Sequence, residues 1–241
     1  MQLDPNIFKL EETTIWSFKK RGCWATHSGD YRGNCAPQVV RNLILKYTKV
    51  GDVFLDSFCG SGTSLIECKL LNRRSIGIDV NVNTLKIAQN KLKFNCNNLY
   101  EPKLVRANSI DLKNIIPDNK IDFIFAHPPY ANAIKYSDNI KEDISRLNID
   151  DFLLSMDLFS KKCFRILKKN GICSILIGDI RKNKKIIPIG FQIMNKFLEI
   201  GFSIEEIIIK EQHNCKMTEY WKNKKKDFYL LAHEYIFILK K

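Results

Sequence analysis

The chain has 241 residues, enough for one α/β domain with a substantial core, and its 45% hydrophobic content is typical of a globular protein. Its 39 lysines and arginines exceed its 26 aspartates and glutamates, and the formal charge of +13 favours a polyanionic partner such as nucleic acid. An A/T-rich coding sequence, which also yields many lysines, is the alternative explanation. The eight cysteines show no C-x-x-C spacing and no pairing with histidine, which argues against disulfides and against a bound metal.

No segment approaches the length of apolar sequence that crosses a membrane, and residues 1–12 lack the apolar core of a signal peptide. We therefore expect no contact with membranes and a cytoplasmic location.

From about residue 38, short apolar runs alternate with amphipathic helical patterns, which predicts a doubly wound, mostly parallel seven-stranded sheet. Ligands in such sheets bind at the carboxyl ends of the strands. The last two runs have a short connection and are expected to pair as antiparallel strands. The expected strands are residues 52–58, 75–80, 102–108, 121–127, 172–179, 202–212 and 227–241. The expected helices are residues 39–48, 64–72, 83–94, 151–171 (with Gly171 as the stop) and 188–201.

The segment "DSFCGSGT", residues 56–63, follows the first of these strands and precedes a helix. Its two glycines permit a tight turn and a close approach of a ligand to the backbone. It is no phosphate-binding Walker loop, because no Lys-Ser/Thr pair follows, and it lacks the third glycine of a dinucleotide fingerprint. A purely structural turn is the alternative.

Two polar residues follow the next two strands. Asp79 ends the strand after the glycine loop, where a carboxylate can accept hydrogen bonds from ribose hydroxyls. Asn108 follows the next strand and could read the edge of an adenine. A helix-capping aspartate and an ordinary loop asparagine are the alternatives.

The fourth strand end carries "HPPY", residues 127–130. The double proline removes two backbone donors and fixes two φ angles, so this loop is stiff, extended and rich in free carbonyls.

Together these four segments resemble the amino-directed DNA methyltransferases, which use S-adenosylmethionine to methylate adenine N6 or cytosine N4. The resemblance covers roughly residues 16–240 and implies a Rossmann-like methyltransferase sheet. The matches to the family's D-x-F-x-G-x-G cofactor loop are Asp56, Phe58, Gly60 and Gly62, with Thr63 beside them. Asp79 matches the ribose-binding acid, and Asn108 is taken as a further cofactor residue.

His127, Pro128, Pro129 and Tyr130 match the catalytic (D/N/S)-P-P-(Y/F) loop of this family, with a departure at the first position. In the implied mechanism the Pro128 carbonyl and the side chain at 127 accept hydrogen bonds from the target amine, and Tyr130 stacks on a base flipped out of double-stranded DNA. A neutral imidazole has one acceptor nitrogen and an imidazolium has none, so we expect activity to fall as pH drops through the histidine pKa. An inactive protein is the alternative. Because histidine replaces the residues usual at position 127, this position does not clearly indicate the target base, and we favour adenine slightly over cytosine.

Two clusters mix aromatic and basic residues, a pattern that can grip nucleic acid. The first spans residues 16–34 and provides Lys19, Arg21 and Arg32. It could equally be a lid over the cofactor or a structural arm, since residues 27–48 look like the cofactor-side segment of permuted family members. The second spans residues 210–226 and provides Tyr220, Trp221 and Lys224, or is a solvated hairpin.

We therefore expect residues 1–35 to form an arm or cofactor lid and residues 36–241 to form a single catalytic domain. The segments between motifs are short, so we expect no separate large target-recognition domain among these residues. The competing hypotheses are an RNA amino-methyltransferase and a nucleic-acid-binding paralogue with weak or no catalysis. A homodimer and a restriction partner both stay open.

Overall fold

The computed structural model describes residues 2–112, 115–131, 136–137, 139–213, 220–222, 224 and 227–241. Parts of two segments with predicted roles, the one after the double proline and the one between the last two strands, lie outside these ranges. The strands are β1 (Ile15–Trp16), β2 (Val53–Asp56), β3 (Arg74–Asp79), β4 (Lys103–Arg106), β5 (Ile121–Ala126), β6 (Leu167–Ile177), β7 (Ile180–Lys182), β8 (Lys185–Ile187), β9 (Ser203–Glu211) and β10 (His233–Lys240). The helices are α1 (Pro37–Tyr47), α2 (Thr63–Leu70), α3 (Val82–Lys91), the short 3₁₀ turn η2 (Ile144–Arg146), α4 (Ile149–Ile166) and α5 (Ile189–Ile200).

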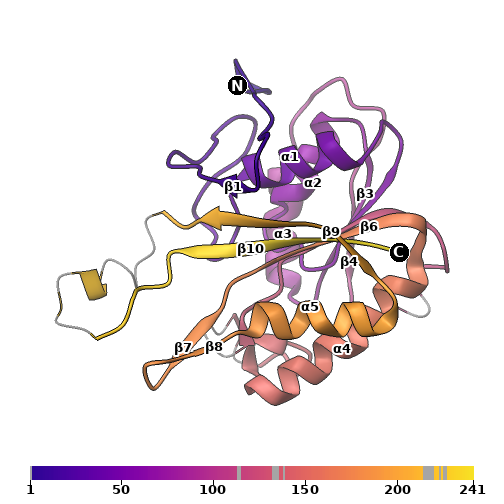
Figure 1. The fold of residues 1–241 in the computed structure, drawn as a ribbon. Coiled ribbons are helices and arrows are strands. Elements are labelled where there is room, and N and C mark those ends of the chain that lie inside the picture. Colours follow the sequence, from indigo (N-terminus) through magenta and orange to yellow (C-terminus); the bar gives the residue numbers. More distant parts are fainter. Residues whose placement is uncertain are drawn as a thin grey trace.

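One mixed sheet organises the molecule, with strand order β1-β9-β10-β6-β5-β2-β3-β4 (Figure 1). Strands β4, β3, β2, β5 and β6 run parallel to one another, and β10 lies antiparallel between β6 and β9. The doubly wound, mostly parallel sheet and the antiparallel C-terminal pair are therefore confirmed. The sheet has one strand more than the seven predicted, because Ile15 and Trp16 add a two-residue edge strand parallel to β9.

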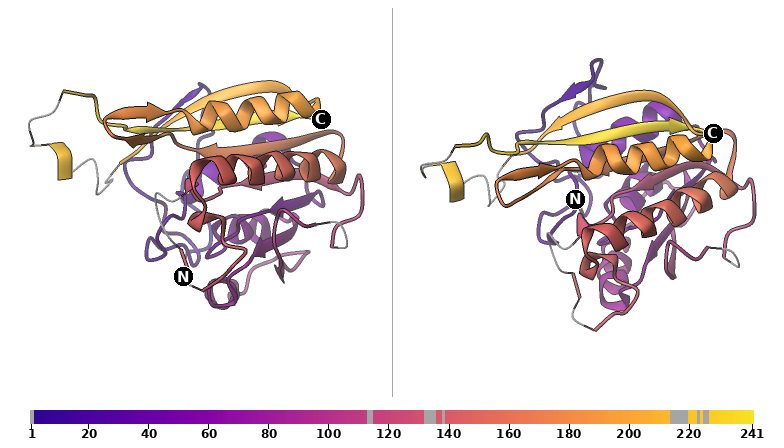
Figure 2. Two further views of the ribbon diagram at one scale, coloured as in Figure 1. Left: turned by 90° about the horizontal axis from the view of Figure 1, so that it is seen from below. Right: turned by 60° about the horizontal axis from the view of Figure 1, so that its bottom comes forward.

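Helices cover both faces of the sheet: α1, α2 and α3 lie on one face and α4 and α5 on the other (Figures 1 and 2). The central strand β5 shows why both faces need covering helices: its successive residues point to opposite faces of the sheet and are buried on both. Phe123 packs with α1, whereas Ile124 belongs to the core under α4 and α5. Burial on both faces is the rule for parallel strands joined by crossover helices. None of the helices in the described ranges is long and apolar enough to cross a membrane.

The predicted helix 151–171 is wrong at its C-terminal end. Asn148 caps the helix by accepting a hydrogen bond from the Asp151 N–H at 2.9 Å, as a good N-cap should. The helix ends at Ile166, and β6 begins at Leu167 with no loop between them. Gly171 is not a helix stop, because it already lies in β6 and its carbonyl accepts from the Lys241 N–H at 3.1 Å. Pairing with the end of the chain, which a local pattern does not reveal, decides this boundary.

The antiparallel hairpin β7–β8 was not predicted. It forms within the basic run at residues 180–187, directly after β6, and extends beyond the sheet (Figure 1). Contacts between described residues join it to residues 227–229. The Arg181 guanidinium donates to the Tyr229 carbonyl at 2.9 Å and lies 4.6 Å from the centre of the Phe228 ring, and Lys184 pairs with Asp227 at 3.0 Å. We call residues 180–187 with 227–231 the hairpin arm.

Candidate active site

A cavity of about 1480 Å³ opens at the edge of the sheet where the parallel strands end. Parallel strands present all their carboxyl ends at one edge, so polar residues that follow different strands meet there. The cavity brings together most of the predicted site residues. Its wall contains Lys19, Arg21, Arg32, Asp56, Phe58, Gly60, Thr63, Asp79, Asn108, His127, Pro128, Pro129, Tyr130 and Trp221. Gly62, Tyr220 and Lys224 lie outside the wall.

The glycine loop joins β2 to α2 through two residues in the left-handed region. Gly60 has φ of 49° and Gly62 has φ of 83°, conformations that residues with a Cβ adopt at a cost. A Cβ on Gly62 would also lie 3.2 Å from the Cβ of Ala88 on α3. Gly62 therefore permits close packing of helix and loop, whereas Gly60 lines the cavity.

Asp56 is almost fully buried beneath this loop. Its Oδ1 accepts from the Phe58 N–H at 3.0 Å, and its Oδ2 accepts a short hydrogen bond from the Ser64 hydroxyl. Burial raises the pKa of this carboxyl to about 7, although these hydrogen bonds favour the charged form. Asp56 thus shapes the loop and places a titratable group at the cavity wall.

Asp79 holds the opposite side of the glycine loop. Its Oδ2 accepts from the Gly60 N–H at 3.2 Å, and its Oδ1 accepts from the Asn81 N–H at 2.8 Å. Burial raises its pKa, which those two hydrogen bonds oppose. The helix-cap alternative fails, because the Asn81 side chain caps α3 by accepting from the Asn83 N–H at 2.9 Å. Asp79 remains available to a ligand in the cavity.

Asn108 closes a local turn after β4 and also lines the cavity. Its Oδ1 accepts from the Ile110 N–H at 3.0 Å, as in a loop asparagine. This hydrogen bond uses one of the two lone pairs of the oxygen, so the cofactor role stays a prediction.

The double-proline loop leaves β5 with His127 and Tyr130 facing each other. The Nε2 atom of His127 lies 3.2 Å from the Tyr130 hydroxyl, which donates a short hydrogen bond to Oε1 of Glu234. The other oxygen of Glu234 accepts from Lys210 Nζ at 2.6 Å. Burial lowers the pKa of His127 to about 4, so its imidazole is neutral at physiological pH.

Glu234 and Lys210 were missed by sequence reasoning. They sit on β10 and β9, directly opposite each other in the antiparallel ladder, with side chains only 10% and 14% exposed. The signal that could have found Glu234 is its position in "HEYIFIL", where a carboxylate interrupts a run of apolar and aromatic residues. Such a residue needs a buried partner, and the sequence does not say which.

Tyr31 belongs to the predicted aromatic and basic cluster at residues 16–34, but it was not predicted individually as a site residue. Its ring covers Gly60, where a Cβ would lie 3.3 Å from Tyr31 Cε1, and its hydroxyl lies 3.3 Å from Thr84 Oγ1. Burial raises its pKa to about 12, so it is uncharged. The arm therefore reaches over the glycine loop.

The predicted nucleic-acid residues divide into two groups. Lys19, Arg21 and Arg32 lie in the cavity wall, and Arg21 donates to the Asn34 carbonyl at 3.4 Å. Nε and Nη2 of Arg21 are buried without a hydrogen-bond partner in the described part of the chain, and burial lowers the pKa of this guanidinium. Tyr220, Trp221 and Lys224 form a second cluster, and of these three residues only Trp221 also lines the cavity. Lys224 Nζ lies 3.4 Å from the centre of the Tyr220 ring, and Trp221 packs against Phe228 of the hairpin arm at 5.9 Å between ring centres.

Within the described ranges, no group of three or more histidines, cysteines, aspartates or glutamates is placed to hold a metal ion. Seven of the eight cysteines lie in those ranges, and all seven are free thiols; Cys215 lies outside the described residues.

Curated proteins similar to this chain include both DNA and tRNA methyltransferases. The Type II methyltransferase M.MjaII of Methanocaldococcus jannaschii is 27% identical over 173 residues, which are 70% of this chain and 27% of that protein. The tRNA (guanine(10)-N2)-dimethyltransferase of Methanothermobacter thermautotrophicus is 29% identical over 121 residues, 50% of this chain and 34% of that protein. The chain thus spans about a third or less of the length of these relatives.

Solved structures share the fold. TrmN from Thermus thermophilus aligns with a TM-score of 0.59 at 17% identity, over 87% of this chain and 50% of that one. A SAM-dependent methyltransferase from Methanosarcina mazei aligns with a TM-score of 0.55 at 16% identity, over 83% of this chain and 96% of that one. A family model described as DNA methylase matches residues 5–90 and 121–241, well over half of the sequence. The chain belongs to this DNA methylase family.

Proposed function

We propose that the protein transfers a methyl group from S-adenosylmethionine to an exocyclic amino group of a base flipped out of DNA, with adenine N6 slightly favoured over cytosine N4. The observation that carries the proposal is the single cavity, whose wall contains both the glycine loop with Asp79 and the double-proline loop. A methyl donor bound at the glycine loop and an amine bound at the double-proline loop would therefore lie in the same cavity.

The residues at the glycine loop fit the cofactor. Gly60 lets a ligand approach the backbone, and Asp79 offers carboxylate oxygens to ribose hydroxyls. The unpartnered nitrogens of Arg21 in the cavity wall could bind the carboxylate of its methionine moiety. S-adenosylmethionine, when bound, supplies an electrophilic methyl group on a sulfonium. Residues 1–35, which include Tyr31 over Gly60, would act as its lid, and residues 36–241 as the catalytic domain.

The double-proline loop would activate the amine. The lone pair of an exocyclic amine is delocalised into the base, and two acceptors on its N–H groups make it available. One acceptor is the Pro128 carbonyl and the other is the neutral His127 imidazole. Tyr130 lines the same cavity and would stack on the base. No strong base is required, because the proton can leave after the transfer. Holding donor and acceptor in near-attack geometry supplies most of the rate.

Lysines and arginines around the cavity would hold the phosphate backbone. Lys19 and Arg32 lie in the wall, and the hairpin arm adds the exposed Lys182 and Lys185. Tyr220, Trp221 and Lys224 would contact nucleic acid beside this arm. Binding should therefore depend steeply on salt concentration.

RNA is the second candidate substrate, and a specific observation favours it: one of the similar proteins is a tRNA dimethyltransferase. The amine-activating loop would work in the same way on RNA. We put DNA first, and the similarity to Type II methyltransferases and the family match support this choice.

The test is transfer of labelled methyl from S-adenosylmethionine to unmethylated DNA and to RNA, followed by nucleoside digestion and mass spectrometry. N6-methyladenine or N4-methylcytosine in DNA is the expected result. Tyr130→Ala should abolish the transfer, whereas Tyr100→Ala, at the opposite edge of the sheet, should not. Label in RNA alone would replace DNA by RNA as the substrate. Absence of label in both, with the cofactor bound, would overturn the proposed activity.

A further inference from the structure

Four polar side chains form a continuous hydrogen-bonded chain behind the double-proline loop. Lys210 donates to Glu234 at 2.6 Å, Tyr130 donates to the other oxygen of Glu234, and His127 Nε2 lies 3.2 Å from the Tyr130 hydroxyl. The chain runs from the two antiparallel strands β9 and β10 to the first residue of the loop. Both charged members are largely buried.

The direction of each proton in this chain follows from hydrogen-bond chemistry. An ionised carboxylate only accepts, so the single hydroxyl proton of Tyr130 must point to Glu234. The Tyr130 oxygen can then only accept, and His127 must donate to it from Nε2–H. In a neutral imidazole the proton on Nε2 leaves Nδ1 with the free lone pair.

The Nδ1 atom of His127 has no hydrogen-bond partner among the described residues, and it is not one of the polar atoms buried without a partner. Since His127 lines the cavity wall, a ligand there can reach this lone pair.

We propose that Glu234, held in place by Lys210, is a positioning residue that acts through Tyr130 to fix His127 as the Nε2–H tautomer, so that Nδ1 accepts a hydrogen bond from the target amine. This inference rests on the proposed methyl transfer. We call the hydrogen-bonded chain Lys210–Glu234–Tyr130–His127 the relay. The family uses Asp, Asn or Ser as the acceptor at position 127, and the relay explains how a histidine can replace them, because it keeps Nδ1 of the imidazole unprotonated. Without the carboxylate, the Tyr130 hydroxyl can turn to donate to Nε2, and Nδ1 then carries a proton that opposes the amine.

The charged groups around the relay keep it in this state. Burial is the largest single effect on Glu234 and would raise its pKa. The charges of Lys210 and His127, together with the hydrogen bonds from Lys210 and Tyr130, outweigh burial and hold the pKa below its usual value. Burial lowers the pKa of His127, Glu234 opposes that shift, and Lys210 adds to it. Burial raises the pKa of Tyr130 well above its usual value, and Glu234, Tyr136 and Cys35 add to this effect. The result is an ionised Glu234, a neutral phenol and a neutral imidazole.

The first test observes the tautomer directly, by ¹⁵N NMR of the full chain labelled at histidine, with the His127 signals assigned by their loss in His127→Asn. We expect the Nε2–H pattern in the wild type and a shift toward Nδ1–H in Glu234→Leu. The matched control is Glu205→Gln, which removes a carboxylate from the exposed ion pair with Lys240 on the same two strands. An Nδ1–H pattern in the wild type would overturn the proposal.

The second test is a double-mutant comparison of methyl transfer. Glu234→Leu should lower kcat on the order of 100-fold, as expected for losing one preorganised hydrogen-bond partner of the reacting group, with little change in KM for the cofactor. The same change in a His127→Asn background should cost much less, because an amide carbonyl accepts without a tautomer. Equal losses in both backgrounds would indicate a structural role and overturn the proposal. An inactive wild type with the expected tautomer would instead refute the proposed function and leave the relay standing.

Discussion

At Asp79 two backbone N–H groups and the proposed cofactor would share one carboxylate. Each oxygen accepts one backbone hydrogen bond and retains a lone pair for the cavity. We expect Asp79→Ala to lower the affinity for S-adenosylmethionine at least ~10-fold, because hydrogen bonds to charged groups contribute about 1.5–3 kcal/mol. Isothermal titration calorimetry measures this, and Glu199→Ala on the exposed face of α5 is the control. An unchanged dissociation constant would remove Asp79 from the cofactor site.

The pH dependence of catalysis is the second prediction at this scale. An unperturbed imidazole would lose its acceptor as pH falls through about 6.5, but His127 has a pKa of about 4. The kcat at saturating cofactor should therefore stay flat from pH 8 to about pH 5 and fall only near the lower value. The stability of the fold should fall in the same direction of pH. The histidine of the unfolded chain binds its proton at a higher pH than the buried His127, so the free energy of unfolding decreases as pH falls from about 6.5 towards 4.

Circular dichroism at each pH separates the two effects, since only folded protein contributes to kcat. Asp56, with a pKa of about 7, can change cofactor affinity in the same range, which is why saturation is needed. An inflection in kcat near pH 6.5 that is absent in His127→Asn would contradict the prediction.

The sequence allowed prediction of those site residues that follow a strand, and the reason is topological. Asp56, Asp79 and His127 each come directly at or after a parallel strand, and parallel strands end at one edge. Glu234 lies inside a strand. Its role depends on its pairing opposite Lys210 and on its hydrogen bond with Tyr130. Both are long-range contacts, which a single sequence does not reveal.

Among the helices and strands, boundaries set by local residues were predicted correctly, and a boundary set by long-range pairing was not. The start of α3 and both ends of α5 were predicted to within one residue, and local residues mark them: Asn81 caps the start of α3 and Gly201 caps the end of α5. The end of α4 was wrong, because the sheet ladder with the chain's last residues overrides the apparent stop at Gly171.

The hairpin β7–β8 carries the prediction that belongs to this scale. Lys182 and Lys185 are paired directly opposite each other, and like charges in such pairs destabilise a hairpin. Replacing both with alanine should therefore leave the fold intact. If the hairpin arm contacts phosphates, the same change should weaken DNA binding and reduce the slope of log K against log salt by up to about 2.

Fluorescence anisotropy with labelled duplex DNA at several salt concentrations gives the slope. The control is the charge-matched pair Lys120→Ala and Lys169→Ala, two exposed lysines where β5 and β6 begin, at the edge opposite the cavity. If both double variants lower the slope equally, DNA binding depends on net charge and the hairpin arm has no special part in it.

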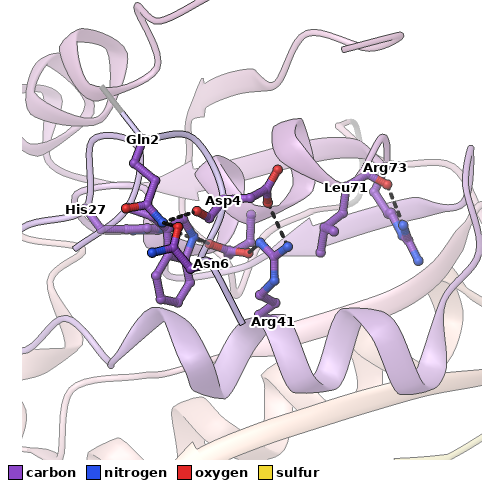
Figure 3. Close-up of polar contacts among 9 residues, drawn as sticks. Gln2, Asp4, Asn6, His27, Arg41, Leu71 and Arg73 are labelled. Carbon is purple, nitrogen blue, oxygen red and sulfur yellow. Dashed lines mark hydrogen bonds and ion pairs between the residues drawn. The ribbon is translucent and has the colours of Figure 1, made fainter. Parts of the chain in front are cut away.

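Across the whole molecule, the N-terminal arm is tied to the helices by a buried charge network. Glu67 on α2 is fully buried and accepts hydrogen bonds from Trp24 Nε1 at 2.7 Å, His27 Nε2 at 2.6 Å and Arg41 Nη1 at 3.0 Å. Arg41 also pairs with Asp4 at 2.7 Å, at the start of the arm (Figure 3). The arm continues into β1, where Trp16 lies opposite Lys210 of the relay.

This network predicts that arm, stability and cofactor binding are coupled. Glu67→Ala removes the buried carboxylate partner of Arg41 and leaves only the exposed Asp4. Breaking a buried ion pair typically costs about 3–5 kcal/mol. Urea unfolding should show that loss, with Glu12→Ala, which breaks an exposed ion pair with Lys9, as the control. If residues 1–35 form a lid, affinity for S-adenosylmethionine should fall as well, since Tyr31 would no longer be held over Gly60. A stable variant with unchanged affinity would contradict the coupling, whereas lost stability with unchanged affinity would restrict the arm to a structural role.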